Sequence, residues 1–180
     1  CADNSIVLII PTIDTELLIL SEHREEFLKL GINIIISDTS LIEACGNKIL
    51  TTALLKKINI KTPDIYDKKN LIYPCFVKPY DGSCSIGAFV LNNKSMLTAD
   101  ILDNPKNMFM EYVPKSYDEY TVDIYCDKFG ELKSLVPRLR IETRAGEISK
   151  GVTSKGAVYD YLKDKLYNLK GVRGCVNLQL

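Results

Sequence analysis

Histidine, net charge and long hydrophobic runs are all scarce in this sequence, and each shortage excludes a class of protein. His23 is the only histidine, so a hydrolase triad of the usual serine or cysteine kind is excluded. Lysine plus arginine number 23 in the 180 residues, as do aspartate plus glutamate, so no basic field favours a nucleic acid or a membrane surface. No apolar stretch approaches the roughly 20 residues that span a bilayer. We therefore expect a small-molecule partner, with no nucleic acid and no membrane.

Cysteines are present but scattered, and the six of them form no C-x-x-C pair. This spacing argues against a zinc site. It is typical of reduced, mostly buried thiols and, since no signal peptide is recognisable, it indicates a cytoplasmic protein. Cys84 stands apart because it lies in a loop of small residues near Lys78, where a lowered thiol pKa would make it reactive. The alternative is that Cys84 is simply another small residue of that loop.

The first forty residues have the pattern of a β-α-β unit. Residues 5–10 and 32–36 are apolar runs, and residues 15–30 have the apolar spacing of a helix that ends at Gly31. Apolar strands separated by a helix imply a parallel sheet covered on both faces. Because two strands are too few for a domain, we expect the chain to begin partway through one. His23 lies on the charged side of the predicted helix, where we expect it to be solvated.

Beyond this unit a helix is followed by a region in which strands dominate. Residues 41–58 have helical spacing, include Lys48, and stop before a proline. Residues 120–126 and 132–141 predict an antiparallel pair joined by a hairpin loop that ends in glycine. The other predicted elements are a strand ending at Lys78, strands at 88–91, 108–113 and 175–180, a short helix from about Lys94, and a helix at 157–169. The fold class is therefore α/β, of the α+β kind.

A loop of small residues directly after an apolar strand is the most informative local feature. The strand ends in Lys78, and the loop carries the glycines and serines Gly82, Ser83, Ser85 and Gly87. A lysine supplies a point charge beside phosphate oxygens, glycines let the backbone approach closely, and serines add donors. The spacing is neither that of a P-loop nor that of a dinucleotide fold, so a generic glycine-serine turn is the alternative.

Four features of the sequence occur in the order and spacing of an ATP-grasp nucleotide site. They are Lys48, Lys78-Pro79 with the loop, residues 110–113 as a strand-to-loop hinge, and Glu119 within residues 117–123. The chain thus resembles the ATP-grasp superfamily, and most of all the large chain of carbamoyl-phosphate synthase and the stand-alone enzymes named after it. Residues 10–17 look like the end of a preceding Rossmann-like domain, and residues 136–142 and 146–151 like the substrate-side strands.

The resemblance covers essentially the whole chain and implies an ATP-grasp fold that follows the end of a Rossmann-like (pre-ATP-grasp) domain. We expect residues 1–42 to be a partial pre-ATP-grasp β-α-β unit and residues 43–109 to be the small lid subdomain. Residues 110–180 would then be the C-terminal subdomain, which is incomplete.

The resemblance also implies which residues hold the nucleotide. Lys48 and Lys78 would approach the α- and β-phosphates from two sides. The main chain of residues 111–113, which are Glu111, Tyr112 and Val113, would receive adenine. Glu119 would accept hydrogen bonds from the ribose hydroxyls. The alternatives are exposed lysines and a solvated acidic loop residue.

Arg138 and Arg140 share one face of a predicted strand because side chains alternate with a period of two. Together they are candidate catalytic residues that clamp a carboxylate or the γ-phosphate, and Arg144 would join the same cluster. The alternative is an outward basic ladder paired with Glu142 or Glu147. By the resemblance, the side-chain oxygen of Gln179 would reach a metal ion.

The resemblance implies an enzyme, an ATP-dependent ligase that activates a carboxylate or bicarbonate as an acyl phosphate for attack by an amine. Its cofactors would be ATP and Mg²⁺ or Mn²⁺. The principal magnesium ligands of the superfamily lie on a later Glu-x-Asn strand, and nothing follows Leu180. We therefore expect this chain to be a fragment that is itself inactive.

Two other functions stay open at this stage. One is a non-catalytic nucleotide-binding module with a regulatory or structural role, and the other is an unrelated α/β binding domain whose loop is only a turn. The sequence also leaves open a stand-alone enzyme, a homodimer and an association with a glutaminase-type subunit.

Overall fold

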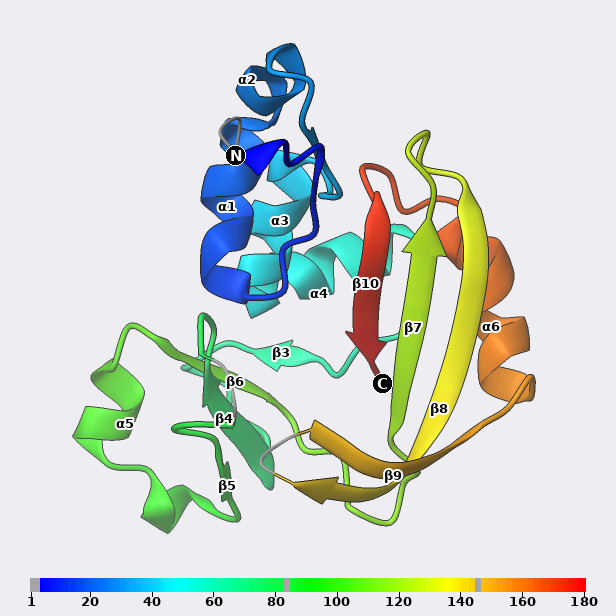
Figure 1. The fold of residues 1–180 in the computed structure, drawn as a ribbon. Helices are drawn as coiled ribbons and strands as arrows, with labels where there is room; N and C mark the ends of the chain where they lie inside the picture. Colours follow the sequence, from blue (N-terminus) through cyan, green and yellow to red (C-terminus); the bar gives the residue numbers. More distant parts are fainter. Residues whose placement is uncertain (1–3, 83–84, 145–146) are drawn as a thin grey trace. The chain divides into compact units, whose positions relative to one another are not determined.

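The structure, a computed structural model, describes residues 4–82, 85–144 and 147–180. The chain divides into two compact units, whose elements are labelled in Figure 1. The first unit combines Cys1–Cys45, Tyr120–Leu139 and Thr153–Leu180, and the second combines Gly46–Glu119 and Arg140–Val152. The boundaries after residues 42 and 109 that the resemblance implies stay a prediction.

The N-terminal part of the first unit is a β-α-β arrangement, as predicted. Strands β1 (Leu8–Ile9) and β2 (Asn33–Ile34) pair in parallel, with Leu8 opposite Asn33. Both strands are shorter than the predicted runs of residues 5–10 and 32–36. Ser5, with a φ of 53°, lies in the left-handed region, so a strand does not begin there.

The single helix predicted for residues 15–30 is wrong, because two helices replace it. Helix α1 (Asp14–Glu22) and helix α2 (Arg24–Lys29) are separated at His23, whose φ and ψ are −95° and 6°. The His23 side chain is half exposed, and its Nδ1 lies 3.1 Å from Glu26 Oε1. The prediction of a solvated histidine is confirmed. Helix α3 (Thr39–Gly46) follows β2.

The remaining strands of the first unit belong to a sheet in the order β10-β7-β8-β9. Strand β7 (Tyr120–Cys126) has the predicted bounds and pairs antiparallel with β8 (Leu132–Arg144), which confirms the predicted hairpin. Gly130 closes the hairpin loop with a φ of 82°, which favours glycine. Strands β9 (Glu147–Thr153) and β10 (Gly174–Gln179) complete the sheet. Residues 140–152 of the β8–β9 hairpin are counted in the second unit.

The two faces of strand β7 differ in character. Helix α6 (Ala157–Leu166) lies beside this sheet in Figure 1, and Leu162, Leu166, Val122 and Ile124 are all buried. The helix ends three residues before the predicted end at residue 169. The alternate residues of β7, Asp123 and Tyr125, keep accessible surface. One face of β7 is therefore apolar, and the other is free for polar chemistry.

The second unit is built on a sheet in the order β3-β6-β4-β5, all of whose pairs are antiparallel. Its elements are α4 (Lys48–Lys57), β3 (Ile65–Tyr66), β4 (Cys75–Pro79), β5 (Phe89–Leu91), the 3-10 turn η2 (Lys94–Met96), α5 (Ala99–Asp103) and β6 (Asn107–Glu111). The core of this sheet is formed by Cys75, Val77, Leu91 and Phe109, each exposed by 1% or less.

Two sequence predictions for this region need correction. The helix predicted over residues 41–58 is interrupted at Asn47, which is extended and whose side chain accepts from the N–H groups of Ile49 (2.9 Å) and Leu50 (3.3 Å). Asn47 is thus the N-cap of α4. Strand β6 ends at Glu111 rather than at residue 113.

None of the helices in the described part of the chain has the length and apolar character needed to cross a membrane.

Candidate nucleotide-binding site

Lys48 is tied to the small-residue loop by both its main chain and its side chain. It is the first residue of α4, and its N–H donates to the carbonyl of Tyr80 at 2.9 Å. Its ammonium group donates to the carbonyl oxygen of Gly82. The N-terminal turn of α4 and the start of the loop are therefore held together, within one unit.

Lys78 brings a second ammonium group to the same region. It lies on β4, opposite Met108 of β6, and its Nζ is 5.8 Å from the centroid of the Phe76 ring. Burial, and then the positive charge of Lys48, lower the pKa of the Lys78 side chain. A lysine that is destabilised by both desolvation and a like charge gains most when an anion arrives. The pair therefore has the electrostatics of an anion site.

The glycines of the loop are required by its packing on Pro79. A Cβ at Gly82 would lie 3.2 Å from the Pro79 Cβ, and a Cβ at Gly87 would lie 3.3 Å from the Pro79 Cγ. Gly87 has a φ of 73° and Ser85 a φ of 56°, so the backbone turns through the left-handed region twice. The predicted donor Ser83 and the candidate thiol Cys84 lie outside the described residues.

An ion pair borders the loop on its N-terminal side. Lys106 Nζ lies 2.8 Å from Asp81 Oδ2, and the N–H of Tyr80 donates to the Lys106 carbonyl at 3.0 Å. The hydrogen bond from Lys106 holds the pKa of the Asp81 carboxyl below its ordinary value. Asp81 is thus already paired with one cation, Lys106, and the charge of Lys48 also acts on it.

The predicted adenine hinge lies at the end of β6. The Glu111 N–H donates to the Asp64 carbonyl at 2.8 Å, and Glu111 Oε2 accepts from the Asp64 N–H at 3.2 Å. These bonds engage the N–H and the carboxylate of Glu111 within the sheet. Tyr112 and Val113 follow the strand end, and Val113 is half exposed. Their main-chain groups are therefore better placed than the Glu111 N–H for contact with a base.

Two residues that were predicted for different roles, Glu119 and Arg140, are paired with each other. Glu119 Oε1 lies 3.3 Å from Arg140 Nη1, and the Arg140 side chain is only 5% exposed. Lys48, Lys78, the hinge, Glu119 and Arg140 all belong to the second unit.

Arg138 and Gln179 belong to the first unit, where the strand register aligns them. Both lie directly opposite Thr121 of β7, Arg138 on β8 and Gln179 on β10. Arg138 Nη2 is 2.8 Å from Asp123 Oδ2. Arg138, the predicted clamp residue, and Gln179, the predicted metal ligand, are thus on one face of the sheet, with Thr121 between them.

The arginines of β8 differ in their ion-pair partners. Arg138 pairs with Asp123 and Arg140 with Glu119. Arg144 pairs with Glu142 at 3.1 Å, and Lys150 pairs with the same carboxylate at 2.6 Å. The side chain of Glu147 lies outside the described residues.

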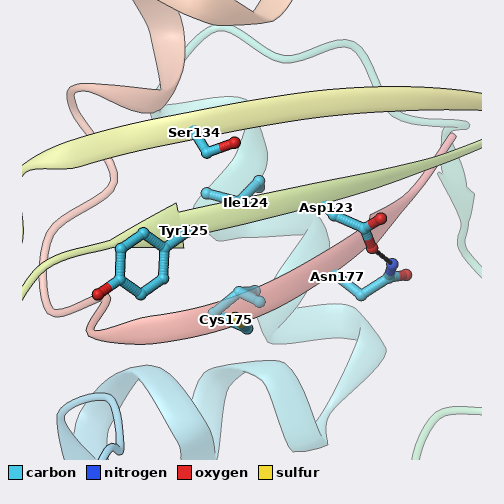
Figure 2. Close-up of a pocket in the computed structure, with 7 residues that line it drawn as sticks. Asp123, Ile124, Tyr125, Ser134, Cys175 and Asn177 are labelled. Carbon is cyan, nitrogen blue, oxygen red and sulfur yellow. Dashed lines mark hydrogen bonds between the residues drawn. The ribbon is translucent and has the colours of Figure 1, made fainter. Parts of the chain in front are cut away.

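Sequence reasoning missed Asp123 and its second neighbour Asn177. Asp123 Oδ1 accepts from Asn177 Nδ2 at 2.8 Å, and both residues line a cavity of about 270 Å³ that is drawn in Figure 2. Tyr125, Ser134 and Cys175 also line it. The only signal in the sequence was the alternation that placed Asp123 on the polar face of its strand.

The described residues do not fit a metal site of their own. No group of three or more histidine, cysteine, aspartate or glutamate side chains comes together within residues 4–82, 85–144 and 147–180. Gln179 offers one neutral amide oxygen, whereas Mg²⁺ in proteins takes one or two carboxylates besides phosphate oxygens.

No protein-family model matches the sequence, and no curated protein matches it. Solved structures match its fold. The biotin carboxylase domain of 2-oxoglutarate carboxylase from Hydrogenobacter thermophilus, solved with MgADP, ADP and bicarbonate, has a TM-score of 0.74 and 15% identity over 98% of this chain and 45% of that one. N5-carboxyaminoimidazole synthetase from Staphylococcus aureus has a TM-score of 0.67 and 15% identity over 96% of this chain and 48% of that one.

A third similar structure is D-alanine-D-alanine ligase from Helicobacter pylori, with a TM-score of 0.58 and 20% identity over 89% of this chain and 55% of that one. The chain thus spans about half the length of each of these three proteins. They are ATP-grasp ligases, and this chain has the ATP-grasp fold, as the sequence predicts.

Proposed function

We propose that the protein is an ATP-dependent ligase that activates a carboxylate or bicarbonate as an acyl phosphate and transfers the acyl group to an amine. The observation that carries the proposal is that the Lys48 ammonium group is bonded to the small-residue loop and that its charge acts on Lys78, a partly buried lysine near the end of the strand before that loop. Both are in the unit that also holds the predicted adenine hinge and Glu119.

ATP would bind by replacing interactions that the free protein makes with itself. The Lys48 ammonium group would exchange the Gly82 carbonyl for phosphate oxygens, which are stronger acceptors because they are charged. The phosphates would offset the burial and the charge of Lys48, which together lower the pKa of Lys78. Donors of the loop, including Ser83 and Ser85, would complete the phosphate contacts. The main chain at Tyr112 and Val113 would hold adenine, and Glu119 would accept from the ribose.

The chemistry then consists of two displacements. An oxygen of the carboxylate attacks the γ-phosphorus and the bond to ADP breaks, which leaves an acyl phosphate and ADP. The lone pair of the amine attacks the acyl carbon, the bond to phosphate breaks, and the amine loses a proton to water. Arg138 and Arg140 would hold the anionic groups, so the protein contributes charge and position rather than a covalent nucleophile.

The names of the similar proteins support this class and leave the substrate open within it. Bicarbonate is bound in the 2-oxoglutarate carboxylase structure, and another similar structure is an L-amino acid ligase from Bacillus licheniformis. Our finer proposal is a carbamoyl-phosphate synthase-like enzyme of the cytoplasm, with bicarbonate as its substrate and ATP with Mg²⁺ or Mn²⁺ as its cofactors. An amino-acid carboxylate is the second choice.

The test is release of ADP and phosphate by the complete protein that the gene encodes, with Mg²⁺ and ATP, against bicarbonate and a panel of amino acids. Stimulation by one carboxylate would support the ligase and identify its first substrate. ATP binding without turnover on any carboxylate would favour the non-catalytic regulatory module instead. In the same protein Lys78→Ala should weaken ATP binding, and unchanged affinity would contradict the phosphate role of Lys78.

A further inference from the structure

Asp123 connects three strands of the first unit through its carboxylate. Its Oδ2 lies 2.8 Å and its Oδ1 3.1 Å from Arg138 Nη2, and Oδ1 also lies 2.8 Å from Asn177 Nδ2. Asn177 is directly opposite Asp123 in the register, whereas Arg138 is reached diagonally, since it stands opposite Thr121. Figure 2 shows Asp123 and Asn177 facing each other across β7 and β10. One carboxylate thus orients a cation on one side and an amide on the other.

The bonds to Asp123 determine which hydrogen-bonding groups of Arg138 and Asn177 remain available to a ligand. Arg138 donates from Nη2 to Asp123, and its Nε is buried without a hydrogen-bond partner among the described residues. Its second amino group, Nη1, has no hydrogen bond within the described part of the chain and remains a charged donor. Asn177 must turn its NH₂ group to Asp123, because an ionised carboxylate only accepts, so its Oδ1 is left as an acceptor.

Arg138, Asp123 and Asn177 form a row across three strands. The position of this row matters because it includes Arg138 and lies next to Gln179, the two predicted site residues of the first unit. Arg138 is the proposed anion clamp, and Asn177 precedes Gln179 by two residues on the same face of β10. Asp123 itself is 47% exposed and Arg138 34% exposed, so the row lies at the surface of the sheet rather than in its core. An exposed ion pair by itself contributes little to stability, which leaves orientation as the role to test.

We propose that Asp123 is a positioning residue, which holds Arg138 and Asn177 in the orientation that receives the carboxylate substrate. The inference rests on the proposed function, because the anion that Arg138 meets is the substrate of that reaction. Without the Asp123 carboxylate the guanidinium rotates among its rotamers, and the substrate must order it on binding. The cost then falls on substrate affinity more than on turnover.

The test compares Asp123→Asn with Asp160→Asn. Asp160 is an exposed aspartate of α6 in the same unit, 2.9 Å from Lys163 Nζ, so the control removes the same charge from an ordinary ion pair. The first measurement needs no activity: nitrogen NMR of the arginine Nε–H groups, with the Arg138 signal assigned by Arg138→Lys. In Asp123→Asn we expect hydrogen exchange at the Arg138 Nε–H to be about tenfold faster and to approach that of the exposed Arg144. In Asp160→Asn we expect the exchange rate at Arg138 to be unchanged. Unchanged exchange in Asp123→Asn would overturn the proposal.

The second measurement is carboxylate-dependent ADP release by the complete protein. Asp123→Asn should raise the KM for the carboxylate about tenfold, with kcat within about threefold and the KM for ATP unchanged, and Asp123→Glu should restore part of the loss. A fall in kcat and melting temperature at unchanged KM would mean that Asp123 is only structural. If the unaltered protein binds ATP but turns over no carboxylate, the proposed function fails, and the exchange measurement still decides whether Asp123 orients Arg138.

Discussion

The ion pair between Glu119 and Arg140 joins two residues that the sequence predicts for different parts of one reaction. Their side chains approach to 3.3 Å, and the N–H of Arg140 also donates to the Glu119 carbonyl at 2.8 Å. Arg140 is almost fully buried, while Glu119 is half exposed. Glu119 is exposed enough to meet a ligand while it holds a buried guanidinium, so a change at Glu119 should affect both ligand binding and stability.

Glu119→Gln should weaken ATP binding and lower the free energy of unfolding together. Loss of the charge-assisted bonds to ribose is expected to raise the Kd for ATP about tenfold. Loss of the charge beside Arg140 is expected to cost about 1–2 kcal/mol in a denaturant titration. Calorimetry gives the Kd. Glu131→Gln is the control, because Glu131 is an exposed partner of Lys133 at 2.6 Å and should change neither quantity appreciably. If Glu119→Gln bound ATP normally, the ribose role would be wrong.

As the pH rises, ATP binding should begin to weaken at a lower pH than it would if Lys78 had the pKa of an ordinary lysine. Burial and Lys48 lower the pKa of Lys78 below 10.5, so Lys78 loses its proton, and its attraction for phosphate, within the window between the lowered pKa and 10.5. The stability changes in the opposite direction. In that window the unfolded chain still holds the proton, so unfolding takes up a proton and the free energy of unfolding rises with pH.

The measurement is the Kd for ATP in steps from about pH 7 to about pH 10. Lys78→Arg stays charged throughout this range and should flatten the curve. Lys56→Ala, which removes an exposed lysine paired with Asp64 at 2.9 Å in the same unit, should leave the curve as it is. A Lys78→Arg variant that followed the pH curve of the unaltered protein would show that another group titrates.

The strands could be predicted from sequence more fully than the helices. The sequence predicts the strand of residues 120–126 with the observed bounds, because a half-buried strand alternates and Gly130 marks its turn. The break at Asn47 had a signal, since asparagine is a favoured N-cap, but continuous apolar spacing outweighed it. The break at His23 had none. There Ser21 Oγ donates to the Leu18 carbonyl at 2.7 Å, a local bond that competes with the regular helix.

The candidate site could be predicted only as far as local pattern reaches. Alternation placed Arg138 and Arg140 on one face of a strand, but their partners come from β7 and its edge, and alternation says nothing about register. The observed register sets Thr121 opposite Arg138, with an irregularity near Tyr125. The sequence therefore offers the nearby acidic residues Glu142 and Glu147 as partners, whereas Asp123 and Glu119 pair with Arg138 and Arg140 in the structure.

Gly174→Ala should destabilise the first unit strongly. Gly174 has a φ of 77°, and a Cβ there would lie 2.4 Å from the Ile35 Cγ2, a branched methyl with little freedom to move. Backbone strain and overpacking together should cost about 2–4 kcal/mol in a denaturant titration. Gly46→Ala is the matched control, because a Cβ at Gly46 meets nothing within 4 Å and alanine favours the helix. Equal stabilities of the two variants would mean that Ile35 and Gly174 are not in contact in solution.

The cysteines of the described residues should react with alkylating reagents in an order set by burial. Burial raises the pKa of the Cys75 thiol, and burial followed by the charge of Asp127 raises that of Cys126, so both should be protected in the native protein. Cys175 is a free, exposed thiol that lines the cavity of Figure 2.

With iodoacetamide near neutral pH, peptide mapping should show Cys175 modified at least about tenfold faster than Cys75 or Cys126. Cys175→Ser should remove that fast site, and unfolding in denaturant should bring Cys75 and Cys126 to the rate of an exposed thiol. Cys75 lies on β4, which pairs with β5 and β6, and its side chain is fully buried in the core of the second unit. Fast native labelling of Cys75 would therefore mean that this sheet opens readily. The same unit carries Lys48 and Lys78, so protection of Cys75 also reports whether the framework of the proposed phosphate site is formed in the absence of ATP.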